Sequence, residues 1–221
     1  QVLVSTGFAF YPIECYIPKF DAVYGGRTFG PTPLSFALPA IANPIVCDAL
    51  LYGLSHPNVA LSLEVLSRFR LQNVMVVSSS PDMVHFIDEL APFANNKLGR
   101  IIDDVNAGVQ WINVREMTGN AHCACDEIGP GPSLMENIQR SVVALAGRSP
   151  GPQEDIIALN AAAILLLARK VTELQEGFIL ARELIRSGAA LSTMKTFILG
   201  TGGTLHSLNT LLGEGNESNT S

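Results

Sequence analysis

Hydrophobic residues follow strand-like patterns in the first half of the chain and helix-like patterns in the second half. Residues 73–79 (NVMVVSS) form a continuous β-branched run without polar alternation, which is typical of a strand covered on both faces. The apolar run at residues 47–54 is also strand-like, and Pro57 begins a mostly apolar helix between the two. A strand, a helix and a strand in this order predict a parallel βαβ unit.

The next apolar segments predict two more strands, at residues 97–103 and 109–114. After the turn at residues 129–133 the patterns are helical only. The helix expected from Asp155 onward is apolar almost all round, so it should be central. Together these patterns predict an α/β fold, with a partly parallel sheet flanked by helices and an all-α cluster at the C-terminus.

Residues that typically cap the ends of helices support the predicted helical cluster. Two capping boxes, in which a Ser or Thr is followed three residues later by Glu or Gln, open two of its helices, and a glycine can end the last one. These residues are Ser133 with Glu136, Thr172 with Gln175, and Gly188. The chain opens at Gln1 without a methionine and runs directly into a strand-like segment. We therefore expect an incomplete α/β domain over residues 1–198, with the helical cluster at 133–198, and a glycine-rich polar tail at 199–221.

Composition narrows the class of protein. Of the 221 residues 48% are hydrophobic and 15% charged, enough to bury a sizeable core. The net charge of −6 and the lack of a basic run argue against a nucleic-acid surface. The apolar stretch at residues 156–168 contains Asn160 and is too short to span a membrane. Without a secretory signal in this sequence we expect a cytoplasmic protein with reduced cysteines, and the C-x-C spacing at residues 122–126 disfavours a zinc site.

Asp88 and Glu89 are the strongest candidates for chemistry. They follow the buried strand at residues 73–79, and ligands of parallel α/β sheets bind beyond the carboxyl ends of the strands. Adjacent carboxylates there suit Mg²⁺ on a substrate diphosphate. The alternative is a solvated acidic turn. Asp103 and Asp104 form a similar but weaker pair, because they precede a strand.

Two other side chains have a functional and an ordinary interpretation. Arg27, in a turn-rich region, could bind a carboxylate or phosphate through two hydrogen bonds, or be a surface arginine. His85 could be a general base near Asp88, or a hydrogen-bonded exposed residue. No Ser/His/Asp or Cys/His arrangement follows from the spacing, and we assign no catalytic residue.

A glycine-rich stretch lies near the C-terminus, where an apolar run leads into Gly200, Thr201, Gly202 and Gly203. Glycines after a strand expose backbone N–H groups that cradle phosphate, so these four residues are a candidate phosphate site. The alternative is coincidence in a flexible tail, since the segment that follows is a poor helix.

Several segments together resemble the anthranilate phosphoribosyltransferase family, over most of residues 7–191. They are GFAFYPIECYIPKF, GGRTFG, NP, VMVVSS, IDEL and, above all, DIIALNAAAILLL with LQEGFILARELIRSGAA. The resemblance implies transfer of a phosphoribosyl group from phosphoribosyl pyrophosphate to anthranilate in tryptophan biosynthesis, with Mg²⁺ and commonly as a homodimer. It implies that Asp88 and Glu89 fall on the metal-binding pair, and that Arg27 falls on the arginine that contacts the anthranilate carboxylate.

The sequence also departs from the family. Ile17-Pro18 stands where the family has a His-Pro pair, and TPLSF at residues 32–36 stands where it has an R-T-x-F-N motif. The family's glycine-rich phosphate loop belongs before Gly7. The stretch at residues 200–210 mimics that loop, either through circular permutation or by coincidence. We therefore expect a transferase that is inactive alone and is completed by this loop, by a complementing chain or in a homodimer. The alternative is an inactive relative that acts as a partner or scaffold protein.

Overall fold

The computed structural model describes residues 4–6, 47–69, 71–119, 125–129 and 131–214. In this part of the chain five strands form one sheet in the order β1-β2-β3-β4-β5. The first three strands pair in parallel and the last two antiparallel, so the predicted partly parallel sheet is confirmed. The strands are β1 (Val4–Thr6), β2 (Ala49–Gly53), β3 (Asn73–Ser80), β4 (Asn95–Ile102) and β5 (Val105–Ile112).

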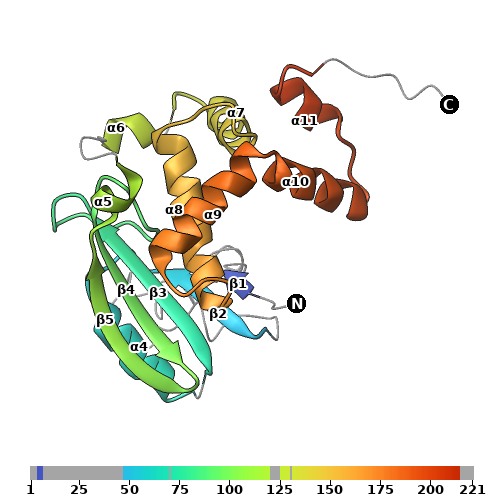
Figure 1. Cartoon of the computed structure of the whole chain (residues 1–221). Helices are drawn as coiled ribbons and strands as arrows, with labels where there is room; N and C mark the ends of the chain where they lie inside the picture. The colour runs from blue at the N-terminus through green and yellow to red at the C-terminus, as the bar shows by residue number, and fades with distance from the viewer. Residues whose placement is uncertain (1–3, 7–46, 70, 120–124, 130, 215–221) are drawn as a thin grey trace, which may run out of the picture.

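Helix α4 (Val59–Ser67) joins β2 to β3 and completes the predicted parallel βαβ unit. The remaining helices of the described residues follow β5. They are α5 (Val114–Thr118), α6 (Cys125–Ile128), α7 (Leu134–Leu145), α8 (Pro152–Leu167), α9 (Leu174–Arg186), α10 (Ala189–Gly200) and α11 (His206–Leu211). Helices α8 and α9 pack on the face of the sheet opposite α4, and α7, α10 and α11 lie beyond them (Figure 1). None of the described helices is long and apolar enough to cross a lipid bilayer.

Strand β3 is apolar on both faces because helices cover both faces of the sheet. Met75 and Val77 pack in a core with residues of α8 and α9, including Phe178. Val74 and Val76, which point the other way, pack in a second core with Leu63 and its neighbours on α4. At β3 the sheet is therefore the middle of three layers, which explains the absence of polar alternation in the sequence of this strand.

Helix α8 is central, as its nearly all-round apolar sequence predicts. It packs against α9, α7 and the sheet, and Ala158, Leu159, Ala162 and Ala163 are fully buried. The helix starts at Pro152, three residues before the expected start at Asp155, because proline suits the first turn of a helix. Helix α9 approaches closely at Gly177, where an added Cβ would lie 3.1 Å from Cα of Ala162.

The predicted helix caps are partly correct. Ser133 Oγ accepts a hydrogen bond from the Glu136 backbone N–H, as expected of a capping box. Before α9, however, Thr172 N donates to Glu176 Oε2 at 3.0 Å, so the partner is Glu176 and not Gln175. Gly188 has the predicted left-handed backbone, with φ of 78°, between α9 and α10.

The segment from residue 199 to 214 differs from the polar tail that the sequence suggests. The apolar run before Gly200 is the end of α10, and α11 follows after a short connection. Leu208 and Leu212 are buried against Val142 of α7, and Arg148 Nη1 donates to the Leu212 carbonyl at 2.8 Å. This part of the chain is therefore folded onto α7, because its leucines complete an apolar cluster there.

A candidate metal site beyond strands β2 and β3

Asp88 and Glu89 lie where the chain returns alongside the carboxyl end of β3. The turn after β3 brings Ile87 back to Ser79, and these two residues exchange backbone hydrogen bonds of 3.0 and 2.8 Å. Ser79 Oγ also donates to the Glu89 carbonyl at 2.6 Å. The acidic pair thus follows a short ladder that is anchored to a buried strand.

The turn itself is organised by Asp82. Its Oδ1 accepts hydrogen bonds from the backbone N–H groups of Val84 and His85, and its Oδ2 lies 2.6 Å from His85 Nδ1. These hydrogen bonds, above all the one from the His85 ring, hold the pKa of Asp82 well below its usual range. His85 is exposed and paired with Asp82. This arrangement matches the ordinary interpretation of His85 and disfavours a role as a general base near Asp88.

Gly53 at the end of β2 gives Asp88 its place. A Cβ added at Gly53 would lie 1.5 Å from the Asp88 carbonyl oxygen and 2.3 Å from its carbonyl carbon. The backbone of Asp88 therefore packs directly on the Cα of Gly53. Since β2 and β3 are parallel neighbours, the acidic pair lies at the carboxyl ends of both strands, the edge at which α/β sheets bind ligands.

Two asparagines fix the residues after Glu89. Asn160 of α8 accepts a hydrogen bond from Leu90 N at 3.0 Å and donates to Leu90 O at 2.9 Å. Asn96 accepts from Ala91 N at 2.8 Å and donates to Ala91 O at 2.9 Å. The Leu90 and Ala91 side chains are fully buried, so the segment that carries the carboxylates is anchored on both sides.

The electrostatic environment of the pair is acidic. Asp88 is partly buried, and Glu89 is exposed as a whole residue. Partial desolvation raises the pKa of Glu89, and the negative charge of Asp88 raises it further. Two carboxylates whose mutual repulsion a cation would relieve, on a fixed backbone, fit Mg²⁺, which typically takes one or two carboxylates and completes its shell with substrate phosphates and water.

In the described part of the chain no three His, Cys, Asp or Glu side chains are grouped to hold a metal ion by themselves. A cation at Asp88 and Glu89 would thus need oxygen ligands from a substrate or from water. That requirement fits a metal that arrives with a diphosphate better than a permanently bound structural metal.

Asp103 and Asp104 are not part of this site. They form the tight turn between β4 and β5, with left-handed φ angles of 50° and 67°, and Asp103 pairs with Arg169. The turn lies at the sheet edge where β3 begins, because Ile102 pairs with Asn73. The weaker of the two acidic pairs is therefore a structural turn at the opposite edge.

The candidate phosphate residues Gly200, Thr201, Gly202 and Gly203 end a helix. The backbone N–H groups of residues 201, 202 and 203 donate to the carbonyls of Phe197, Leu199 and Ile198 at 3.0, 3.1 and 2.8 Å. The apolar run before the glycines is the last turn of α10, so these residues do not form a loop that follows a strand. These N–H groups cap the negative end of a helix dipole, an arrangement that disfavours a phosphate cradle.

Other sequence candidates lie outside the described residues. They are Arg27, the Ile17-Pro18 pair, residues 32–36 and most of the C-x-C segment at residues 122–126. The role of Arg27 stays a prediction.

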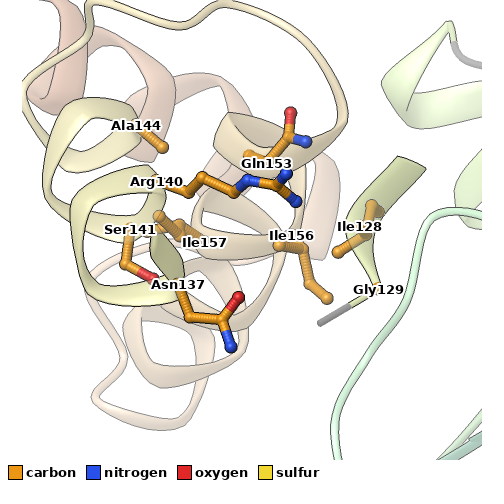
Figure 2. Close-up of a pocket in the computed structure, with 9 residues that line it drawn as sticks. All are labelled: Ile128, Gly129, Asn137, Arg140, Ser141, Ala144, Gln153, Ile156 and Ile157. Carbon is orange, nitrogen blue, oxygen red and sulfur yellow. The ribbon is translucent and has the colours of Figure 1, made fainter. Parts of the chain in front are cut away.

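A pocket of about 160 Å³ lies between α6, α7 and α8 (Figure 2). Arg140 and Asn137 of α7 and Gln153 of α8 line it, over a floor that includes Ile156. Gln153 Nε2 donates to the Glu127 carbonyl at 2.5 Å, Asn137 Oδ1 accepts from Gly131 N at 2.6 Å, and Arg140 pairs with Glu136. The hydrogen bonds of Gln153 and Asn137 tie α6 and Gly131 to α8 and α7, whereas the Arg140–Glu136 pair lies within α7.

The fold and the site together define a class. The chain belongs to the glycosyl transferase family, a/b domain, whose sequence model matches residues 2–191. Among curated relatives it is 30% identical over 196 residues to the anthranilate phosphoribosyltransferase of Thiobacillus denitrificans, covering 88% of this chain and 54% of that protein. It is 28% identical over 192 residues to the enzyme of the same name from Laribacter hongkongensis, covering 85% and 52%.

Solved structures agree with this assignment. The crystal structure of anthranilate phosphoribosyltransferase from Thermus thermophilus matches with a TM-score of 0.66 and 26% identity, covering 86% of this chain and 52% of that one. The Saccharomyces cerevisiae enzyme in complex with 4-fluoroanthranilate shares the fold, with a TM-score of 0.53, 19% identity and coverages of 78% and 45%. The chain thus spans about half the length of the relatives that it matches.

Proposed function

We propose that this chain takes part in transferring the phosphoribosyl group of phosphoribosyl pyrophosphate to anthranilate, in cytoplasmic tryptophan biosynthesis. The observation that carries the proposal is the acidic pair, Asp88 and Glu89, fixed at the carboxyl ends of two parallel strands. Membership of the glycosyl transferase family and similarity to anthranilate phosphoribosyltransferases supply the reaction class.

In this proposal Asp88 and Glu89 would hold Mg²⁺ together with the substrate diphosphate. When bound, the ion would supply charge neutralisation for the leaving pyrophosphate. The chain itself contributes position: the ladder from Ser79 and the contact with Gly53 keep both carboxylates at the sheet edge, without reorganisation when the substrate binds. By resemblance, Arg27 would bind the carboxylate of anthranilate.

A transferase of this kind also needs backbone N–H groups that bind the phosphates of the substrate, here called the phosphate cradle. Because residues 201–203 use their backbone N–H groups to cap α10, we expect other residues to form the phosphate cradle. Without such a cradle, Asp88 and Glu89 are expected to bind the metal-bound diphosphate weakly.

Isothermal calorimetry with Mg²⁺ and phosphoribosyl pyrophosphate tests the metal site. Binding should be lost in a double variant, Asp88→Asn with Glu89→Gln, that keeps the shape of both side chains. The matched control is Asp103→Asn with Asp104→Asn, which removes the same charge at the opposite edge of the sheet; asparagine tolerates the left-handed backbone of that turn. Equal binding by the two double variants, or none by the parent chain, would refute the proposed site.

A non-catalytic role as a partner protein is the second candidate. It is favoured by an apolar hollow of about 370 Å³ between α8, α9 and α10, which the exposed side chain of Leu184 lines. Other apolar side chains of α9 and α10 are also exposed, namely Ile179, Phe197 and Leu199. Sedimentation velocity separates the two candidates when combined with the calorimetry. A chain that self-associates and does not bind phosphoribosyl pyrophosphate fits the partner role.

A further inference from the structure

Asn160 is a polar residue in the middle of α8, a helix that is apolar almost all round. Its neighbours Leu159 and Ala161 are hydrophobic, and asparagine is a poor helix former. Its side chain amide is fully used: Oδ1 accepts from Leu90 N at 3.0 Å, and Nδ2 donates to Leu90 O at 2.9 Å and to Ile156 O at 2.9 Å. An unfavourable residue with every bond satisfied points to a specific task.

The two bonds to Leu90 imitate the pairing of one strand with another. They fix both backbone groups of the residue that directly follows Glu89, across 70 positions of sequence. Leu90 itself is fully buried in the core that α8 shares with the sheet. The backbone next to Glu89 is therefore held from two sides. Asn160 of α8 binds the backbone of Leu90, and Ser79 of β3 binds the carbonyl of Glu89.

We propose that Asn160 is a positioning residue, whose amide holds Leu90 so that the carboxylates of Asp88 and Glu89 face a common metal ion. This inference rests on the proposed metal site. According to this inference, α8 helps to position the metal ligands. The metal affinity then depends on the contact between α8 and the segment after β3.

Two variants of Asn160 test the proposal. Asn160→Leu keeps much of the volume, favours the helix and removes both bonds to Leu90, and Asn160→Ala removes them with less bulk. The control is Ser62→Ala, which removes the buried Tyr52–Ser62 hydrogen bond of 2.7 Å on the opposite face of the sheet. The control should cost stability without touching residues 87–91.

The first measurement is amide hydrogen exchange of residues 87–91, followed by mass spectrometry. Exchange should become about tenfold faster or more in both Asn160 variants, the factor that corresponds to losing one or two hydrogen bonds. The second measurement is a titration with Mn²⁺, with and without inorganic pyrophosphate, read by electron paramagnetic resonance. Affinity should fall roughly tenfold or more in the variants, as for other groups that orient metal ligands, and stay unchanged in Ser62→Ala.

The outcomes are distinguishable. Faster exchange with weaker Mn²⁺ binding, in the Asn160 variants only, supports the positioning role. Unchanged exchange, or faster exchange with unchanged Mn²⁺ affinity, overturns it while leaving the metal site intact. An equal loss of affinity in Ser62→Ala also overturns it, since the effect would then be general destabilisation. If the parent chain binds no Mn²⁺ under either condition, the metal site fails and the inference fails with it.

Discussion

Gly53 allows the backbone of Asp88 to lie directly against β2, because glycine has no side chain. The Asp88 carbonyl occupies the space that a Cβ would need. We expect Gly53→Ala to push the segment of residues 87–90 away from β2 and to lower the free energy of unfolding by about 1–3 kcal/mol, the usual cost of overpacking. Urea denaturation measures the loss of stability, and hydrogen exchange of residues 87–91 locates it.

A matched substitution checks the reason for this effect. At Gly200 an added Cβ would meet nothing within 4 Å, so Gly200→Ala at the end of α10 should leave stability unchanged or raise it slightly. Similar losses in the two variants would show that the crowding at Asp88 is not the cause. A Gly53→Ala protein that exchanges at residues 87–91 like the parent would contradict the prediction as well.

At the scale of single residues the sequence indicates the acidic pair as a candidate but not the residues that hold its backbone. Asp88 and Glu89 stand out because two carboxylates follow a buried strand. Gly53, Asn96 and Asn160 do not, because their roles depend on contacts with parts of the chain that are distant in sequence or hidden in the turn geometry. The pairing of Asp82 with His85 is local, three residues apart, and could have been inferred from its turn-forming sequence.

Glu154 joins two helices, α8 and α9, through a buried charge. Its side chain is fully buried and accepts from Arg182 Nε at 3.2 Å and from Arg186 Nε at 2.8 Å. Glu154→Gln should lower the free energy of unfolding by about 1–3 kcal/mol, because a neutral amide cannot compensate two cations and places donors against them. The loss stays below that of a fully buried pair, since both arginines can turn to water. Urea denaturation monitored by circular dichroism measures it.

The same substitution in an exposed pair is the control. Glu136 pairs with Arg140 one turn away on the surface of α7, and both side chains are more than a third exposed. Glu136→Gln should change stability by no more than about 0.5 kcal/mol. If Glu154→Gln were equally mild, the buried cluster would not be what ties α8 to α9.

At the scale of elements, long hydrophobic patterns predict the type and place of a strand or helix well, and short patterns do not. The continuous run of β3 and the all-round apolar helix α8 were located correctly, because burial on both faces leaves a strong signal in the sequence. The short apolar run before Gly200 is similar to the strand that precedes a phosphate loop, although it ends α10. Three or four apolar residues fit either period, and only their packing near Leu208 and Val142 decides between them.

The whole molecule is organised around a core that crosses the boundary between sheet and helices. Leu51, Met75 and Leu98 from three strands pack in one cluster with residues of α8 and α9. The apolar cluster of α7, α10 and α11 joins this core through the contact of α7 with α8. Because no layer buries its apolar face alone, we expect the sheet and the helical cluster to unfold together, although the sequence could be divided at residue 133.

Two probes, one in the sheet and one for the helices, can test whether they unfold together. Trp111 is the only tryptophan of the chain and lies on β5, where Lys97 Nζ is 4.7 Å from its ring, so its fluorescence reports on the hairpin of β4 and β5. Far-ultraviolet circular dichroism reports mainly on the helices that follow β5. In urea both signals should change in a single transition with the same midpoint and slope, because a cooperative domain has one equilibrium for all its parts. An earlier transition in circular dichroism alone would show that the helical cluster unfolds separately, and a substitution in the shared core, Phe178→Leu, should then shift only one of the two curves. In a single domain that substitution shifts both curves equally.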